Sequence, residues 1–345
     1  MTGPRLGLWC DGVPRRALVL CGILLAVLLA APLALNSYLL SVLILVLYFA
    51  YTGQAWNVMM GFAGQLSLGH SLYIGLGAYT AAALFMHFGI NPWVGSLAAM
   101  VVAAAFGAAV GYLAFRFGIG GVYFALLTIA FAEFTRIGFD HFPWVGGAGG
   151  LFLKVVGKGR FDLLHLRGSA VMFYYLLLAL TVAAFLLCHR LMRSKIGYYW
   201  LAIREDQDAA QALGIHTFRY KMYAVLLSSA MTALGGVFYA FYYNNLFPEQ
   251  IFSMERSVEI VLGPIIGGLG TLFGPLLGAF VLTVLAEGLR DLLSALGLAL
   301  PGATQVFYGV CLLAVIVFLP DGIWPGLRRL LGLDRAAGPG PKREG

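Results

Sequence analysis

Long apolar segments recur along almost the whole chain, and they constrain its fold more than any other feature. Segments such as 17–35 and 222–243 are long enough to cross a bilayer core, which takes about 20 helical residues. They lack the wide polar stripe of a soluble amphipathic helix. The chain is 61% hydrophobic and 11% charged, whereas soluble domains are about 45–50% apolar and about 25% charged. The sequence therefore predicts an all-α, polytopic membrane protein.

We expect a single transmembrane domain over 1–345 with about ten spans, each close to the length that a bilayer requires. The 45 glycines suit this fold, because small residues let membrane helices approach closely. The eighth expected span is short and broken. The expected spans are 17–35, 38–59, 66–88, 93–115, 121–139, 170–189, 222–243, 257–269, 271–293 and 303–319.

The positions of Lys and Arg predict the orientation, because cytoplasmic segments of membrane proteins carry an excess of these residues. With both termini in the cytoplasm, the N-terminus 1–16, Arg116, a charged loop 190–221 and the tail 321–345 hold 15 of the 22 basic residues. The loop 140–169 is expected outside, although it carries four basic residues of its own. Basic residues thus lie mainly at span ends, so the net charge of +7 indicates membrane lipid and not nucleic acid as a partner.

Two stretches at membrane depth, 61–77 and 263–278, are poor continuous helices. In a helix interior, Gly is less favourable than Ala by roughly 1 kcal/mol and Pro by about 3 kcal/mol. Irregular backbone persists in a membrane only where it is packed in protein or lines a cavity. Paired interrupted segments in two halves of a chain are typical of a transport pathway. The expected helix breaks and packing positions are Gly61, Gly64, Gly69, Gly267, Gly270, Gly274 and Pro275.

Close helix packing is an alternative explanation for the second stretch. Gly263, Gly267, Gly270, Gly274 and Gly278 follow one another at steps of four and three, which places them on one face of a continuous helix. This spacing alone explains the glycines without any pathway.

The first stretch differs because it also carries polar side chains. We expect Gln65, Ser67 and His70, together with Thr128, to contribute to a translocation pathway. The alternative for His70 is a structural role, since a lone His on an apolar helix is usually held by hydrogen bonds. Both interpretations remain open for these four residues.

Glu133 and Arg136 are ionisable residues near the outer end of the fifth expected span. Such groups are expensive at membrane depth and suggest either function or pairing. Residues three apart share a helix face, so these two side chains can form an intramembrane ion pair. Their long side chains can also reach the interface.

The loop 190–221 contains the most unusual polar segment of the chain. Strong helix formers occupy 203–213, with Ala209, Ala210 and Leu213 on an apolar face, and Gly214 suits the end of the helix. Amphipathic helices that lie on lipid usually have a basic polar face, whereas this one is acidic. An acidic helix with an alanine face suits a groove in a protein. The expected docking residues are Arg204, Glu205, Asp206, Asp208, Ala209, Ala210 and Gly214.

The sequence offers no catalytic constellation, so we expect a transport subunit and not an enzyme. No Lys is followed by Ser or Thr, which excludes the usual phosphate-binding loop for ATP. The six histidines form no pair with zinc-ligand spacing. We therefore expect this chain to bind neither a metal nor a cofactor.

Taken together, these motifs resemble the LivM-type permease subunit of branched-chain amino acid ABC importers. The run Asp208-Ala209-Ala210, followed by Gly214, is similar to the coupling loop of bacterial ABC-importer permeases. Tyr198, Tyr199 and Trp200 depart from the family, where Arg and small residues often stand. The matching motifs lie at 61–71, 75–80, 193–197, 202–206, 212–215, 219–221, 267–275 and 319–322.

The resemblance implies a multi-pass subunit of the bacterial inner membrane. Its partners would be a second, LivH-type permease subunit, two cytoplasmic ATPase subunits that hydrolyse ATP, and an extracytoplasmic substrate-binding protein. Motion of the ATPases would pull on the 205–214 helix and reshape the segments 61–77 and 263–278, past which a zwitterion would move.

The cargo stays open, because related permeases also serve urea and short amides. An ion-coupled secondary transporter is an alternative of another class. It would need carboxylates buried at mid-span, where this sequence has none.

Overall fold

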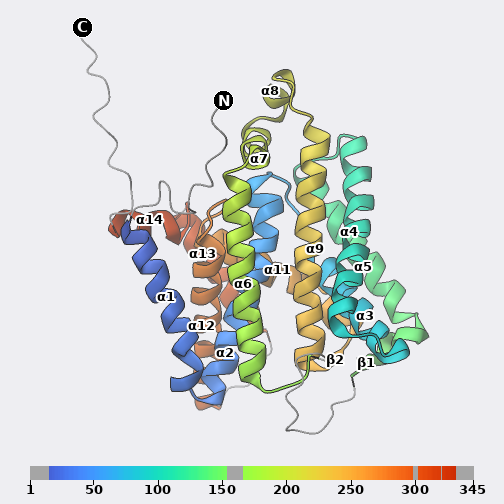
Figure 1. Ribbon diagram of the computed structural model, residues 1–345, viewed down its shortest axis with the longest axis vertical. Coiled ribbons are helices and arrows are strands. Elements are labelled where there is room, and N and C mark those ends of the chain that lie inside the picture. Colours follow the sequence, from blue (N-terminus) through green and yellow to red (C-terminus); the bar gives the residue numbers. More distant parts are fainter. Residues whose placement is uncertain (1–14, 154–165, 298–301, 320, 332–345) are drawn as a thin grey trace, which may run out of the picture.

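The computed structural model describes residues 15–153, 166–297, 302–319 and 321–331, and these residues fold almost entirely into helices (Figure 1). The all-α prediction is confirmed. Parts of the predicted N-terminal segment 1–16, loop 140–169 and tail 321–345 lie outside the described residues.

The described helices and strands follow one another along the chain in a simple order. They are α1 (Arg15–Ala34), α2 (Ser37–Asn57), the π-helix η1 (Val58–Phe62), α3 (His70–Phe88), α4 (Pro92–Arg116), α5 (Val122–Asp140), η2 (Pro143–Val145), η3 (Gly147–Gly149), β1 (Leu151–Phe152), α6 (Ala170–Met192), α7 (Lys195–Glu205), α8 (Gln207–Ala212), α9 (Thr217–Tyr243), β2 (Asn245–Leu246), α10 (Pro248–Ile251), α11 (Met254–Gly267), α12 (Gly274–Ala295), α13 (Ala303–Phe318) and α14 (Ile323–Leu330).

The centre of the bundle is formed by α2 and α9, which are apolar on all sides and are covered by other helices. Helix α2 packs against α6, α11 and α12, whereas α9 packs along α3 and α4. A helix without a polar stripe is stable only when it is surrounded by protein or lipid. The short strands β1 and β2 pair antiparallel at the end of the bundle opposite to α7 and α8 (Figure 1).

Among the described residues, six helices are long and apolar enough to cross a membrane. They are α2 with its extension η1, α3, α4, α5, α6 and α9. Four further predicted spans coincide with α1, α11, α12 and α13. By length and apolarity, the predicted count of about ten is therefore not confirmed.

The first interrupted segment begins later and ends earlier than the predicted 61–77. Gly61 lies within η1, and the backbone is not helical from 63 until α3 begins at His70. The predicted span 66–88 is therefore too long at its start. Gly64, with φ of +70°, lies inside this break, in a conformation that residues with a Cβ rarely adopt.

The second interrupted segment corrects the expectation that its glycines share one continuous helix. Helix α11 ends at Gly267 and α12 begins at Gly274, with non-helical backbone between them. Gly263 and Gly267 instead face Gly274 and Gly278 across a helical hairpin, because a Cβ on Gly267 would overlap the Gly274 carbonyl oxygen. These glycines therefore lie at a contact between two helices and not along one face of a single helix.

We predict that Gly267→Ala weakens this hairpin, because the added Cβ must push α11 and α12 apart. Overpacking of this kind typically costs about 1–3 kcal/mol. Gly288→Ala is the matched control, since no atom lies within 4 Å of a Cβ built there, and Ala is favoured over Gly in a helix by roughly 0.5–1 kcal/mol. Thermal unfolding of the purified protein in detergent measures both. Equal melting temperatures for the two variants would contradict the packing assignment.

Candidate coupling surface and interrupted helices

The charged loop forms two helices and not the single helix predicted over 203–213. Helix α7 ends at Glu205, and Asp206 adopts an extended conformation with φ of −155°. The Asp206 carboxylate accepts hydrogen bonds from the backbone N–H groups of Asp208 and Ala209, both at 2.9 Å. Asp206 is therefore the N-cap of α8. Gly214, with φ of +85°, follows the last turn of α8, as expected for a helix stop.

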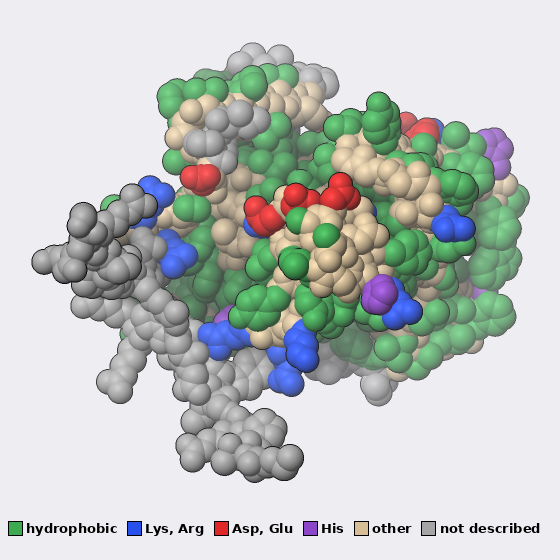
Figure 2. Space-filling model, turned by 90° about the horizontal axis from the view of Figure 1, so that it is seen from above, with side chains coloured by type: hydrophobic (Ala, Val, Ile, Leu, Met, Phe, Trp, Pro, Cys, Tyr) green, Lys and Arg blue, Asp and Glu red, His purple; other side chains and the backbone are tan. Residues whose placement is uncertain are grey.

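The outer surface of α8 is acidic and carries an exposed apolar side chain. Glu205, Asp206, Asp208 and Ala209 are exposed, and Leu213 is 82% exposed. Figure 2 shows acidic side chains gathered near the middle of this end of the molecule, with basic side chains around them. A large apolar side chain at the tip of a polar protrusion, flanked by acids, suits contact with another protein.

Ala210 differs from its neighbours because it faces inward. It is 2% exposed, so the alanine face predicted from the sequence is divided. Ala210 packs inside, and Ala209 remains on the surface together with Leu213. One side of each short helix therefore packs against the bundle.

Two buried side chains fasten α7 and α8 to α9. Trp200 is buried, and its indole N–H donates to the Tyr220 carbonyl oxygen at 2.8 Å. The Lys221 ammonium donates to Gln207 Oε1 at 2.8 Å and lies 4.5 Å from the centre of the Phe115 ring. A displacement of α7 and α8 would therefore be transmitted directly to α9.

Asn57, the last residue of α2, joins the two interrupted segments. Its Oδ1 accepts from the Gly270 N–H at 3.0 Å, and its Nδ2 donates to the Thr271 carbonyl oxygen at 2.9 Å. Gly61 packs against this amide, since a Cβ there would overlap Asn57 Oδ1. Asn57 is fully buried, so both halves of its amide satisfy backbone groups that have no helical partner.

Arg204, at the end of α7, contacts both interrupted segments. Its Nη1 donates to the Gly61 carbonyl oxygen at 2.6 Å, and its Nη2 pairs with Glu205 at 2.8 Å. A Cβ on Gly270 would lie 2.5 Å from Arg204 Nη1, and a Cβ on Gly64 would lie 3.0 Å from its Cγ. Arg204 was expected to face a partner; one of its guanidinium nitrogens is directed inward to Gly61, and 32% of the side chain remains exposed. We call Asn57, Gly61, Arg204 and Gly270 the junction.

The four candidate pathway residues are all buried, with exposures between 0% and 7%. Three of them lie near the start of α3. His70 Nδ1 is 3.0 Å from Ser67 Oγ, and His70 Nε2 is 3.0 Å from Ser228 Oγ. Thr128 Oγ1 accepts from the Leu68 N–H at 3.1 Å. Their polar groups are thus satisfied by neighbours in this conformation, and a pathway role stays a prediction.

Gln65 and Gly69 complete the first break. Gln65 Nε2 donates to the Ala63 carbonyl oxygen at 2.9 Å, which keeps this side chain within its own turn. Gly69 lies directly against α5, since a Cβ there would overlap the Thr128 carbonyl oxygen. In the second break, Gly274 and Pro275 form the buried first turn of α12.

Glu133 and Arg136 form the ion pair that the sequence suggested. Arg136 Nη2 lies 2.5 Å from Glu133 Oε1, and Arg136 Nη1 lies 2.8 Å from Asp140 Oδ2. The Glu133 side chain is 52% exposed, which places the group at the surface of α5. Glu133, Arg136 and Asp140 all belong to α5, so these ion pairs join residues of one helix. Such an arrangement is typical of a structural pair.

Within the described residues, no group of three or more His, Cys, Asp or Glu side chains is arranged to hold a metal.

Two residues of this region escaped the sequence reasoning. Asn57 looked like one polar residue near the end of an apolar span, and only the fold brings it to the 268–273 turn. Lys221 was counted as a basic residue of the loop, although it is buried against Phe115. Asn57 lies four residues before Gly61, a helical spacing that could have linked it to the break.

The chain is similar in sequence to known permease components of transport systems. A sequence model of the family described as "Branched-chain amino acid transport system / permease component" matches residues 38–316. The high-affinity branched-chain amino acid transport system permease protein LivM of Escherichia coli K12 is 28% identical, over 99% of this chain and 83% of the relative. The protein of the same name from Salmonella typhimurium is 27% identical, over 96% of this chain and 81% of the relative.

A more distant relative is the probable branched-chain amino acid transport permease protein LivH of Methanocaldococcus jannaschii. It is 24% identical, over 75% of this chain and 84% of the relative. No solved structure matches the chain. Because the family match covers most of the sequence, from the start of α2 to α13, the chain belongs to the family of permease components of branched-chain amino acid transport systems.

Proposed function

We propose that the chain is a membrane-spanning permease subunit of an importer of branched-chain amino acids in the bacterial inner membrane. The observation that carries this proposal is the alignment of 99% of the chain with a LivM permease. No such observation favours import of urea or short amides, or ion-coupled secondary transport.

The same relatives support a set of partners. We propose pairing with a LivH-type permease subunit, since a LivH protein is itself similar to this chain. Two cytoplasmic ATPases and an extracytoplasmic binding protein complete the proposed importer. The end that carries α7 and α8 faces the cytoplasm in this proposal, as do both termini, and ATP is hydrolysed by the partners.

The outer surface of α8, with Leu213 and the surrounding acids, is the proposed ATPase-docking surface. Exposed apolar area at the centre of a polar rim is typical of protein interfaces. Trp200 and Lys221 hold the inner side of α7 and α8 to α9, so a docked partner would push against an anchored element.

We predict that Asp208→Lys and Ala209→Trp each prevent stable assembly with the ATPases, because one reverses charge and the other adds bulk at the docking surface. Loss of a central contact typically weakens an interface by about 2 kcal/mol, or roughly thirtyfold. Co-purification of the ATPases and uptake of leucine into proteoliposomes measure the effect.

Ala105→Trp is the matched control, since Ala105 is an exposed alanine on α4, away from α8. If the α8 variants retain both ATPases and normal uptake, the docking surface lies elsewhere.

Arg204 supplies the physical connection from the docking surface to the interrupted helices. One guanidinium contacts Gly61 in η1, just before the first break, and lies against Gly270 in the second, while Asn57 at the end of α2 holds Gly270. Displacement of α7 would therefore disturb both breaks at once. A conformational change of this kind requires contacts that differ between the two states, and we propose that these are the contacts of the junction.

We predict that Arg204→Ala uncouples ATP hydrolysis from transport. A hydrogen bond to a charged group contributes about 1.5–3 kcal/mol, so leucine uptake should fall about tenfold or more. The ATPases should still co-purify and hydrolyse ATP. The ratio of leucine transported to ATP hydrolysed measures the coupling.

Arg116→Ala is the control, because Arg116 is an exposed arginine at the same end of the molecule. An unchanged coupling ratio in Arg204→Ala would refute transmission through the junction.

The proposed pathway passes the start of α3, where Gln65, Ser67 and His70 lie near Thr128. Ser67 and Ser228 occupy both nitrogens of the His70 ring in this conformation. When the junction opens, these polar groups can offer their hydrogen bonds in turn to a zwitterion. Short polar side chains suit passage, since weak binding at several positions lets a solute leave again.

We predict that single alanine variants of the four pathway residues alter leucine uptake without loss of the ATPases, because each removes a polar group from the route. Ser229→Ala is the control, because its hydroxyl is also buried but donates to Leu226 within α9. Uptake kinetics in proteoliposomes distinguish the variants. Normal uptake in all four would assign these residues to packing alone.

A further inference from the structure

A polar hollow of about 550 Å³ lies at the opposite end of the molecule from α7 and α8. Helix α9 runs from Thr217 beside the coupling helices to Tyr243 at this end, where β2 and α10 follow (Figure 1). The hollow falls in the size range of small-ligand sites, which is about 300–1,000 Å³. The lining residues are Glu249, Gln250, Ser253, Glu255, Arg256 and Glu259.

Arg256 is the only basic side chain among these lining residues, and it is largely buried. Its side chain is 19% exposed, and Nη1 lies 2.9 Å from Glu259 Oε2. The guanidinium carbon lies 5.1 Å from the centre of the Tyr239 ring, a cation–π distance. Nη2 makes only a long 3.4 Å contact with the Tyr239 hydroxyl. Arginine has further N–H donors, so it retains capacity to bind an anionic group.

The three carboxylates of the hollow are arranged asymmetrically around Arg256. Glu259 is bound to the guanidinium and its side chain is only 18% exposed. Glu255 and Glu249 are exposed at the rim, and Gln305 from α13 donates to Glu255. With one guanidinium against three carboxylates, the hollow is negative at its mouth and has a cation on its inner wall. A ligand that carries both charges would satisfy both parts.

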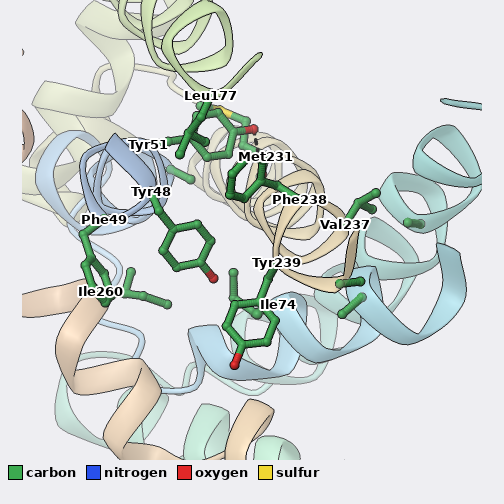
Figure 3. Close-up of a cluster of buried hydrophobic side chains, with 14 of the residues drawn as sticks. Tyr48, Phe49, Tyr51, Ile74, Leu177, Met231, Val237, Phe238, Tyr239 and Ile260 are labelled. Atoms are coloured by element: carbon green, nitrogen blue, oxygen red, sulfur yellow. Dashed lines mark hydrogen bonds between the residues drawn. The ribbon is translucent and has the colours of Figure 1, made fainter. Parts of the chain in front are cut away.

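A buried hydroxyl without a partner belongs to Tyr48, whose ring centre lies 6.2 Å from that of Tyr239. Tyr48 of α2 is 3% exposed, and its hydroxyl makes no hydrogen bond within the described residues. Figure 3 shows the Tyr48 side chain directed toward Tyr239, whose ring contacts Arg256. Buried polar groups normally have partners, so the Tyr48 hydroxyl marks an unused hydrogen-bonding position between α2 and α9.

We propose that this hollow is the receiving site for a zwitterionic α-amino acid before it enters the bundle. Arg256 binds the ligand carboxylate, Glu255 and Glu249 hold the ammonium group, and the Tyr48 hydroxyl is the next hydrogen-bonding position inward. This assignment rests on the proposed importer function and adds the place where the permease first contacts its cargo. Partial occupation of Arg256 by Glu259 keeps the binding weak, as release toward the membrane interior requires.

The test uses the assembled transporter in nanodiscs without its binding protein, and saturation-transfer NMR of three probes. The probes are leucine, leucinamide, which lacks the carboxylate, and 4-methylpentanoate, which lacks the ammonium group. Leucine should bind, and each truncated probe should bind about tenfold more weakly or less, because one charged partner in the site stays unpaired. Arg256→Gln should abolish leucine binding, and Glu255→Gln should weaken it.

Arg116→Gln is the control, because Arg116 is an exposed arginine at the end of α4 and does not line the hollow. It should bind leucine as the wild type does. Equal binding of all three probes, or leucine binding that survives both Arg256→Gln and Glu255→Gln, would overturn the assignment. Docking of the binding protein is measured separately. If Arg256→Gln bound leucine normally but no longer docked the binding protein, the assignment would also be overturned, since the hollow would then be a protein interface.

The same complex, reconstituted into proteoliposomes together with its binding protein, separates this proposal from the importer function on which it rests. A wild-type complex that imports leucine but shows no binding at the hollow refutes the receiving site alone. A wild-type complex that assembles but imports no branched-chain amino acid refutes the proposed function.

Discussion

The hydrogen bonds that Asn57 and Arg204 make with the backbone of two interrupted segments determine how the end of the bundle next to α7 is built. Each break exposes amide and carbonyl groups that a continuous helix would satisfy. Inside a membrane these groups have no water to replace the lost partners. Asn57 bonds to Gly270 and Thr271, and Arg204 bonds to Gly61. In this conformation the two breaks are therefore held against each other and against α7.

This dependence explains why so many glycines meet at one place. An unsatisfied buried backbone group costs about 1–3 kcal/mol. The two interrupted segments must therefore lie close enough together for their backbone groups to reach the Asn57 amide and the Arg204 guanidinium. Gly61 and Gly270 leave no room for a Cβ beside Asn57 and Arg204. The hairpin of α11 and α12 obeys the same requirement, because Gly267 and Gly274 are in backbone contact. Because the backbones at the junction are in close contact, a displacement of α7 would be passed on to both interrupted segments.

Much of this arrangement could be predicted from the sequence, and the reasons are local. Apolar length predicts the helices, Gly and Pro content predicts the two breaks, and an acidic helix before Gly214 predicts an exposed coupling element. The split of that element at Asp206 was missed, because Asp is acceptable in a helix and is only favoured as an N-cap. The inward direction of Arg204 was missed too, since contacts 143 residues apart leave no local signature.

The central claim is that α7 transmits ATPase motion to both breaks together through Arg204. Hydrogen–deuterium exchange of the assembled importer, trapped with ATP by hydrolysis-deficient ATPases, tests it most directly. Exchange should slow in α8, where the ATPases dock, and should become faster in both 61–69 and 268–273 as the junction opens. Slower exchange in α8 with unchanged exchange in both breaks would contradict the claim.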